Sequence, residues 1–596
     1  MWKTLFRRFF ALHRIPLQWA RKKLNASAFL FLSAILTGIS AGLAAYALKS
    51  LVHYVNVFFI QENPIPFGRY MLPFFPMIGL LLCVFVVRYF YKNEAGKGIA
   101  RVLQAIARQN SVIPPNRMHS QVVTAGITVG LGGSSGLEGP IVVTGAAIGS
   151  NYARSYRLGY RERTLLLAAG VAGGIAAVFN APVAGLMFAI EIILAGVVLT
   201  EFMPLIVAAV SGALCGQLLL HQGVLFHFDH LPSFYIKDLP WFILLGFLAA
   251  NLSIYYGKAT HQVELFFYRL RHWPYARAVI GGLVLALLIA LFPALFGEGF
   301  SFLQALIDGH PERLVQGSLI PWPSTSSFWL LLVIGCTVLF KSIATATTIH
   351  AGGNGGNFAP SLFMGGMLGW TFAQVINLLF DSEVSSTQFM LVGMAGMLSG
   401  VMYAPLTAIF LIAEISGSYT LILPLMVVAA VSYFTTRYLR PISPETALLV
   451  EKGEIYTGHK DENVLQNIAL GKIIEKDILS LRAEQTLGDL VEAIRASPRQ
   501  IFAITTEKGD FLGLISLEQV KTILFDREQY DVIRLESLVK PPAGILPVDA
   551  SMKTVIHIFE ETGAWNLPVV QGSQFIGLIS RSSVFSAYRN ELIRQS

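Results

Sequence analysis

Two short segments place glycine, proline and a polar side chain at a spacing that could bind an anion. Residues 136–140 read GLEGP and residues 356–360 read GNFAP, so both have the form G-x-x-x-P. An apolar stretch follows each segment, and proline is tolerated in the first turn of a helix because its missing N–H would be unpaired there. We therefore expect a helix to begin at each segment, with free backbone N–H groups and the positive end of the helix dipole facing an anion.

Glu138 is the acidic residue of the first segment, and the stretch that follows it is apolar. An ionised carboxylate at membrane depth costs several kcal/mol unless it is compensated, and helix N-termini offer that compensation. One hypothesis is that the Glu138 carboxylate occupies the anion site and blocks the path until it is protonated or displaced, as a gate would. The alternative is a structural carboxylate that pairs with an arginine or caps a helix.

The composition indicates a membrane domain followed by a soluble one. Hydrophobic residues make up 54% of the chain and charged residues only 13%, against roughly 25% charged in an ordinary soluble domain. Residues 1–440 hold 15 of the 36 acids, and the remaining 21 follow. We therefore expect a basic cytosolic segment at 1–27, a membrane domain at 28–440, a linker at 441–470 and a soluble tail at 471–596.

The apolar runs between 28 and 440 are broken by glycine and proline, and some are shorter than the ~20 residues that a full span needs. Broken helices are tolerated in a bilayer only where they are buried in protein or line a wet cavity, which favours a permeation pathway. The first 23 residues carry seven basic residues and no acid, so the N-terminus is expected in the cytoplasm. The same bias explains the net charge of +8 without nucleic acid.

The membrane domain contains an internal repeat. Residues 168–192 match residues 391–415 at an offset of 223, and the two G-x-x-x-P segments are 220 residues apart. Two repeats at about 28–220 and 240–440, with glycine- and proline-broken helices, indicate a transporter-like fold whose site lies near the middle of the membrane. The alternative is that the small residues merely allow helices to pack closely.

These segments resemble the CLC family of chloride channels and transporters. Residues 136–140 are similar to its G-[KR]-E-G-P motif, residues 356–360 to its G-x-F-x-P motif and residues 179–191 (FNAPVAGLMFAIE) to its adjoining helix. The resemblance implies an all-α membrane domain of inverted repeats with short tilted helices, a homodimer with one anion pathway per subunit, and bound chloride. It makes Glu138 the gate. The anion-binding residues that it implies are Gly136, Leu137, Gly139, Pro140, Gly356, Asn357, Phe358, Ala359 and Pro360.

Three positions depart from the family pattern. Lys97 stands in EAGKGI, where the family's first motif presents a serine to the anion; it could be a fixed countercharge, or it could snorkel to the surface or pair with Glu94. Glu191 is followed by Ile192, where proton-coupled members have a second glutamate as the inner proton relay. Residues 440–449 contain no tyrosine to close the inner end of the pathway, and Glu445 is the best match. These departures favour an anion channel over a proton-coupled exchanger, which remains the alternative.

The tail resembles a tandem CBS pair, with domains expected at about 471–530 and 537–596. Strands are expected at 501–506, 511–516, 568–570 and 574–580, helices at 486–496 and 552–562, and the sequence GLIS recurs at 513 and 577. CBS nucleotide sites often have a Ser or Thr at the last position of this pattern and an acid three residues after it. Here Gln519 follows Ser516 and Ser583 follows Ser580, so we expect no cofactor, with adenine nucleotide as the alternative.

Two other classes of protein compete with an anion carrier. An intramembrane enzyme could use Ser134 or Ser135 with His350 as base, although no H-E-x-x-H motif occurs. A metal-cation transporter needs several converging oxygen ligands, and the acids in the apolar runs are few and isolated. We therefore expect a non-enzymatic, multi-pass protein of the cell membrane, in contact with lipid and small anions, with its tail in the cytoplasm.

Overall fold

The computed structural model describes residues 23–61, 71–91, 98–194, 202–220, 226, 234–320, 322, 327–447, 450, 468 and 470–595. The chain divides into two compact units, Met1–Thr457 and Gly458–Ser596. Lys97 and Glu94 lie outside the described residues.

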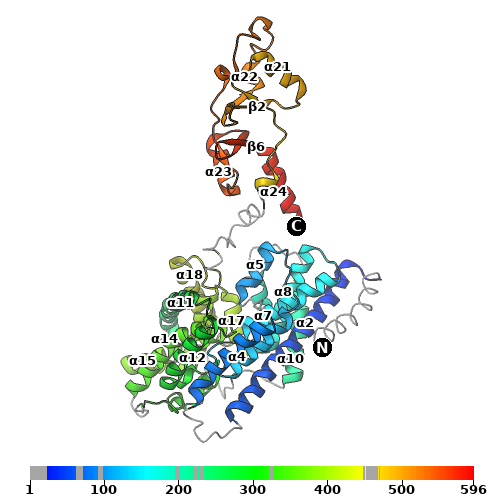
Figure 1. The fold of residues 1–596 in the computed structure, drawn as a ribbon. Coiled ribbons are helices and arrows are strands. Elements are labelled where there is room, and N and C mark those ends of the chain that lie inside the picture. Colours follow the sequence, from blue (N-terminus) through cyan, green and yellow to red (C-terminus); the bar gives the residue numbers. More distant parts are fainter. Residues whose placement is uncertain are drawn as a thin grey trace. The chain divides into compact units, whose positions relative to one another are not determined.

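The described part of the first unit is helical (Figure 1). Its α-helices are α2 (Ala26–Asn56), α4 (Phe75–Tyr89), α5 (Ile99–Arg108), α6 (Arg117–Gly130), α7 (Glu138–Ser155), α8 (Tyr160–Phe179), α9 (Pro182–Phe188), α10 (Met203–Leu220), α11 (Leu239–Arg269), α12 (Pro274–Leu291), α13 (Phe300–Ile307), α14 (Ser327–His350), α15 (Phe358–Phe380), α16 (Ser386–Met402), α17 (Pro405–Ile415) and α18 (Ile422–Leu439). Short helical turns are η1 (Val57–Gln61), η2 (Leu72–Phe74), η3 (Ala189–Ile193), η4 (Ile236–Asp238), η5 (Pro293–Leu295) and η6 (Pro311–Leu314).

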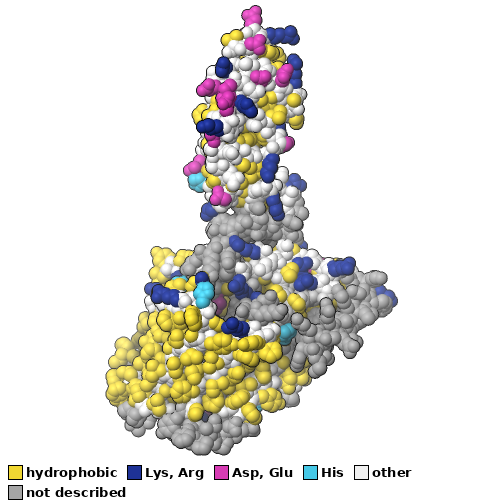
Figure 2. Space-filling model, in the orientation of Figure 1, with side chains coloured by type: hydrophobic (Ala, Val, Ile, Leu, Met, Phe, Trp, Pro, Cys, Tyr) yellow, Lys and Arg dark blue, Asp and Glu magenta, His cyan; other side chains and the backbone are white. Residues whose placement is uncertain are grey.

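Among the described residues, eight helices are long and apolar enough to cross a membrane, and several others, including α9, α16 and α17, are shorter. Their outward side chains are apolar: Leu283 and Leu287 of α12 are 52% and 62% exposed, and Leu378 of α15 is 71% exposed. Figure 2 shows hydrophobic side chains over a broad face of this unit. An apolar surface of this extent suits contact with lipid rather than water.

The sequence repeat is visible as a repeated break between helices. α8 ends at Asn180, whose φ is 53°, and α9 begins at Pro182. In the second half α16 ends at Tyr403, whose φ is 57°, and α17 begins at Pro405. A left-handed residue stops a helix and a proline suits the first turn of the next one, so the same local chemistry shapes both halves at an offset of 223.

Glu414, near the end of α17, caps the start of α9 in the other half. Its carboxylate accepts hydrogen bonds from the N–H groups of Val183 at 3.0 Å and Ala184 at 2.8 Å. The first N–H groups of a helix have no partner within that helix, so a carboxylate that binds two of them stabilises both the helix and its contact with α17.

Glu191 makes the matching contact in the opposite direction. It lies in η3, directly after α9, and accepts from the N–H groups of Leu406 at 2.9 Å and Thr407 at 2.7 Å, and from the Thr407 hydroxyl at 2.6 Å. Glu191 and Glu414 are 223 residues apart, so the two halves cap each other's helices reciprocally. The Glu191 carboxylate is therefore engaged in holding the two halves together.

The second unit contains two small sheets of the same topology. The first has the order β1-β2-β3 and the second the order β4-β5-β6; in each, the first pair is parallel and the second antiparallel. The strands are β1 (Ser480–Arg482), β2 (Ile501–Thr505), β3 (Phe511–Ser516), β4 (Leu546–Pro547), β5 (Asn566–Gln571) and β6 (Gln574–Ser580). The helices are α21 (Leu487–Ala496), α22 (Leu517–Val520), α23 (Met552–Thr562) and α24 (Arg581–Gln595). The expected strands and helices of the tail are confirmed to within a few residues.

The two halves of the tail meet at β3 and β6. The Phe511 N–H donates to the carbonyl of Ser573 at 2.8 Å, and the rings of Phe511 and Phe575 stack with centroids 5.3 Å apart. Each half has its own apolar core, so the tail is a pair of similar modules joined along their sheets.

The reciprocal capping predicts matched losses of stability. Glu414→Ala and Glu191→Ala each remove charged hydrogen bonds worth about 1.5–3 kcal/mol, so each variant should lower the melting temperature of the detergent-purified protein to a similar degree. Thermal unfolding followed by tryptophan fluorescence measures the effect, with Glu383→Ala as the control because Glu383 is exposed between α15 and α16. A Glu414→Ala variant as stable as the control would contradict the capping role.

Candidate functional site

The two G-x-x-x-P segments meet through their backbones. The Gly136 N–H donates to the Gly356 carbonyl at 3.0 Å, and the Gly356 N–H donates to the Gly136 carbonyl at 2.8 Å. Such a reciprocal bridge has local two-fold symmetry, and it joins two positions that match at the sequence offset of 220. It brings the N-termini of α7 and α15 next to each other.

A second reciprocal pair holds the loops that carry these segments. The Ser134 N–H donates to Thr348 Oγ1 of α14 at 3.1 Å, and the Asn354 N–H donates to Thr128 Oγ1 of α6 at 3.0 Å. Each half thus supplies a threonine that fixes the other half's loop, again at an offset of 220. The Asn354 amide adds bonds to Gln121 at 2.9 Å and to Thr124 at 2.7 Å.

Glycine is required where the two helix starts approach. A Cβ added at Gly356 would lie 2.6 Å from the backbone nitrogen of Gly139, and one added at Gly139 would lie 3.0 Å from the Gly356 Cα. Distances this short are not tolerated between real Cβ and backbone atoms, so any side chain would separate α7 from α15. Leu137, Pro140, Ala359 and Pro360 are likewise buried around this junction.

Glu138 is the first residue of α7, and its side chain folds back over the junction. The residue is 1% exposed. Its Oε2 would be 2.0 Å from a Cβ at Gly136 and 3.6 Å from one at Gly356, so it lies over both bridging glycines. The carboxylate interacts with the N–H groups of Glu138 and Ala359, but neither oxygen has a partner in hydrogen-bonding geometry. A buried carboxylate without a well-formed partner therefore occupies the space between two helix N-termini.

An aromatic cluster forms one side of the junction. Phe358, the first residue of α15, is 1% exposed, and its ring centroid lies 5.5 Å from that of Phe179 and 5.9 Å from that of Phe188. These two rings come from the end of α8 and from α9. Their role at the site was not predicted from the sequence, although both lie in the segment that resembles the family's adjoining helix.

Asn357 connects the start of α15 to the predicted inner gate. Its side-chain amide donates to Glu445 Oε1 at 2.7 Å, and its Oδ1 accepts from the hydroxyl of Tyr256 at 2.8 Å. Tyr256 comes from α11 and is fully buried. The structure thus brings Glu445 to the site, and it adds a tyrosine that no sequence motif identified.

Three more charged residues surround the junction. Lys49 of α2 lies within electrostatic reach of both Glu138 and Glu298, and its Nζ donates to the carbonyl of Val178 at 2.5 Å. Lys341 of α14 is fully buried and its Nζ donates to the carbonyl of Gly297 at 2.8 Å. These residues come from two helices and a turn and share no motif with the glycine segments, so the sequence alone does not identify them.

Two other predicted residues have different surroundings. Ile192 lies in η3 and is partly exposed, beside the capping residue Glu191. The hydroxyls of Ser134 and Ser135 are buried without a hydrogen-bond partner, so neither serine is bonded to His350 as a nucleophile would be to its base. His350 instead lies 3.9 Å from Glu264. Among the described residues, no group of three His, Cys, Asp or Glu side chains is arranged to hold a metal ion.

Ser516, Gln519, Ser580 and Ser583 of the tail cap the starts of helices. The Ser516 N–H donates to Gln519 Oε1 at 3.1 Å, and the Ser583 N–H donates to Ser580 Oγ at 3.1 Å. Both candidate nucleotide-binding positions therefore have a local structural role.

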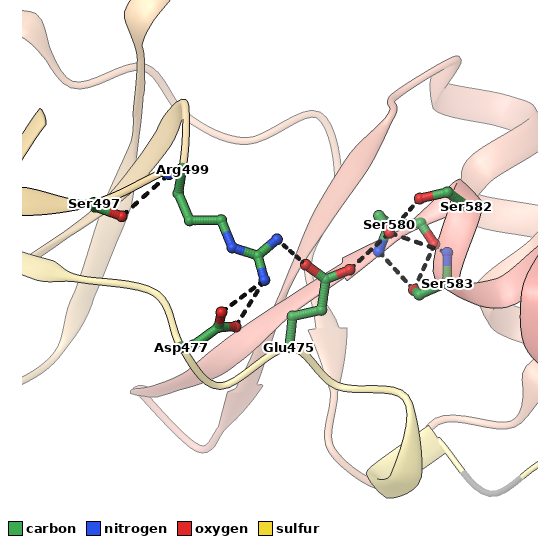
Figure 3. Close-up of polar contacts among 7 residues, drawn as sticks. All are labelled: Glu475, Asp477, Ser497, Arg499, Ser580, Ser582 and Ser583. Atoms are coloured by element: carbon green, nitrogen blue, oxygen red, sulfur yellow. Dashed lines mark hydrogen bonds and ion pairs between the residues drawn. The ribbon is translucent and has the colours of Figure 1, made fainter.

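An acid nevertheless reaches Ser580 from another segment (Figure 3). The Ser580 hydroxyl donates to Glu475 Oε1 at 2.8 Å, and the other oxygen of Glu475 pairs with Arg499 at 2.5 Å. Arg499 also binds Asp477 at 2.8 Å and holds the pKa of that carboxyl below its usual value. The Ser580 hydroxyl is thus already bound by the tail's own side chains.

Comparisons with known proteins agree with this geometry. The family model described as voltage gated chloride channel matches residues 78–437, and the CBS domain model matches residues 535–590. A ClcB-like chloride channel protein of Ralstonia nicotianae is 27% identical over 60% of this chain and 81% of its own length. Chloride channel protein CLC-e of Arabidopsis thaliana is 29% identical over 68% of this chain and 59% of its own length.

Solved structures show the same fold. A slow cyanobacterial Cl⁻/H⁺ antiporter has a TM-score of 0.61 at 22% identity and covers 71% of this chain and 97% of its own. The family match spans the helices that build the junction, from α4 to α18. The chain therefore belongs to the voltage-gated chloride channel, or CLC, family and carries a CBS domain in its tail.

Proposed function

We propose that this protein carries small anions, chloride foremost, across the cell membrane as a channel gated by Glu138. The observation that carries the proposal is the buried Glu138 carboxylate, unpaired at the converging N-termini of α7 and α15. Chloride follows from the names of the relatives, which are chloride channel proteins. N-terminal helix turns attract anions through their free N–H groups and the helix dipole.

Gating follows from competition for one site. The ionised Glu138 carboxylate fills the space over Gly136 and Gly356 and repels an incoming chloride. A proton neutralises the carboxylate and removes its attraction to the helix N-termini, so the side chain leaves and chloride takes its place. The two lysines nearby keep the surroundings positive enough to hold an anion.

A proton-coupled exchanger is the second candidate. It is favoured by the titratable groups near Asn357, where Glu445 interacts with Glu264 and Glu264 lies 3.9 Å from His350. These groups could move protons on the inner side in place of the relay that Ile192 cannot provide. The channel remains the main proposal because Glu191, beside Ile192, is held in its capping role by three hydrogen bonds.

We further propose the oligomeric state and the membrane orientation of the protein. The protein is a homodimer in the bilayer, with one pathway in each subunit and with its N-terminus and tail in the cytoplasm. The hydrophobic outer surface of the membrane unit supports the lipid contact. Lys97, which lies outside the described residues, is proposed as a countercharge on the same pathway, with a surface position or pairing with Glu94 as the alternative.

Glu138→Gln should raise chloride flux and flatten its pH dependence. Glutamine keeps the shape of the side chain but carries no charge to compete with chloride. If about nine tenths of the molecules are closed at neutral pH, the gain is about tenfold. Chloride efflux from liposomes containing the full-length protein, with valinomycin setting the voltage and internal pH recorded, measures flux and coupling together.

Glu312→Gln is the matched control, because Glu312 is an exposed acid in η6. Equal flux in the two variants at every pH would contradict the gate. Proton movement against its gradient at a fixed ratio to chloride in the unmodified protein would instead make it an exchanger, and absence of anion flux would refute anion transport.

Glu445→Ala should raise chloride flux by opening the inner end of the pathway. The variant removes the charge-assisted hydrogen bond to Asn357, and a bond worth about 1.5–3 kcal/mol shifts a closed–open equilibrium by about tenfold or more. The same liposome assay, with Glu264→Ala as a neighbouring control, distinguishes a gate from general loss of negative charge. Flux unchanged or reduced in Glu445→Ala alone would remove Glu445 from the gate.

We propose that the tail is a structural or nucleotide-independent regulatory pair. The observation that supports this is the occupation of the Ser580 hydroxyl by Glu475.

Adenine nucleotides should therefore leave the tail unchanged. A ligand present at ten times its Kd would stabilise the tail by about 1.4 kcal/mol and slow amide hydrogen exchange there. Exchange at residues 574–583 of the full-length protein should be the same with and without AMP, ADP or ATP at millimolar concentration. Nucleotide-dependent protection of these residues that is lost in Ser580→Ala would show a nucleotide site instead.

A further inference from the structure

A tight turn between η5 and α13 carries a second acid to the junction. Gly297 and Gly299 flank Glu298 and have φ values of 62° and 95°, a conformation that other residues rarely adopt. The Gly297 N–H donates to the carbonyl of Gly132 at 3.1 Å, so the turn is fastened to the loop that precedes α7. A Cβ at Gly299 would also strike the ring of Phe363 at 2.5 Å.

This turn places the Glu298 side chain beside the gate. The Glu298 carboxylate interacts with the backbone N–H of Leu137, the residue directly before Glu138. It also lies within electrostatic reach of the Glu138 carboxylate itself. By residue exposure Glu298 is partly exposed, whereas Glu138 is 1% exposed.

Two lysines face this pair of acids. Lys49 of α2 interacts with both carboxylates, and Lys341 of α14 interacts with Glu298. Lys341 is held in place by the Gly297 carbonyl at 2.8 Å and by the Phe363 ring, with Nζ 4.9 Å from its centroid. With all four groups ionised the cluster is neutral. Protonation of Glu138 leaves one net positive charge, which an entering chloride compensates.

We propose that Glu298 is a positioning residue that sets the pH at which the Glu138 gate opens. The inference rests on the proposed gating role of Glu138. An ionised Glu298 repels negative charge on Glu138 and favours its protonated, open form. Lys49 attracts the same charge and favours the ionised, closed form. The two neighbours therefore move the opening pH in opposite directions.

The test is the pH dependence of chloride flux in liposomes, with pH varied on each side of the membrane in turn. Neutral Glu298→Gln should move the midpoint of opening to lower pH by about one unit, the lower end of the 1–3 units that a neighbouring charge produces. Lys49→Met should move the midpoint to higher pH. Glu383→Gln, which changes an exposed acid between α15 and α16, should leave it in place.

A purely structural role would lower the amount of folded protein in both variants without opposite shifts of the midpoint. A Glu298→Gln midpoint equal to that of the unmodified protein overturns the proposal. If Glu298→Gln does not fold, Glu298→Asp tests the proposal instead. Aspartate keeps the acid, but its shorter side chain moves the charge away from the N–H of Leu137. A smaller shift to lower pH supports the proposal, and an unchanged midpoint or a shift to higher pH overturns it.

The experiment separates this inference from the proposed function. Flux of the unmodified protein that does not depend on pH, or that depends on pH equally in Glu138→Gln, removes the gate. A pH dependence that Glu138→Gln abolishes and Glu298→Gln leaves unchanged keeps the gate and removes Glu298 from its control.

Discussion

The reciprocal backbone bridge between Gly136 and Gly356 is the contact on which the membrane unit depends. It joins the starts of α7 and α15 through hydrogen bonds of 2.8 and 3.0 Å, and a Cβ at Gly356 would lie only 2.6 Å from the Gly139 nitrogen. Two further reciprocal contacts repeat the same relation, with Thr128 and Thr348 holding the opposite loops and Glu191 and Glu414 capping the opposite helices. The short helices α9 and α17, which would be only marginally stable alone, are thus each capped by a glutamate from the other half of the chain.

The meeting of the α7 and α15 N-termini gives the site its affinity for negative charge. Two helix N-termini in a buried space attract negative charge, and a carboxylate from one of them fills it when no anion does. The carboxylate has no well-formed hydrogen bond to protein, so it can be displaced more easily than the firmly capped Glu191 and Glu414. Glutamates at α9 and α17 are thus fixed by hydrogen bonds, whereas the Glu138 carboxylate is not, and our proposal that Glu138 is a gate rests on this difference.

The features that could be predicted from the sequence are those that depend on short motifs, on the repeat or on local periodicity. The helix starts at 136–140 and 356–360, the repeat offset and the tail strands such as 511–516 and 574–580 each follow from short motifs or periodicity, and the structure has them. Glu445 was found by its position after the last membrane helix and contacts Asn357. Tyr256, Lys49 and Glu298 could not be found in this way, because they approach the site from distant helices and turns. The capping role of Glu414 could not be predicted for the same reason, because the helix that it caps lies in the other half of the chain. Its match to Glu191 in the repeat did indicate that the two residues have equivalent positions.

Crystals of the Glu138→Gln protein grown with bromide show whether an anion binds at the junction, because the anomalous scattering of bromide identifies the anion. We expect an anomalous peak where the Glu138 carboxylate lies in the unmodified protein, over Gly136 and Gly356 and next to the N–H of Ala359. That peak should be weaker in the unmodified protein at high pH and stronger at low pH. A Glu138→Gln structure with no bromide at this junction would show that the converging helix starts are not an anion site.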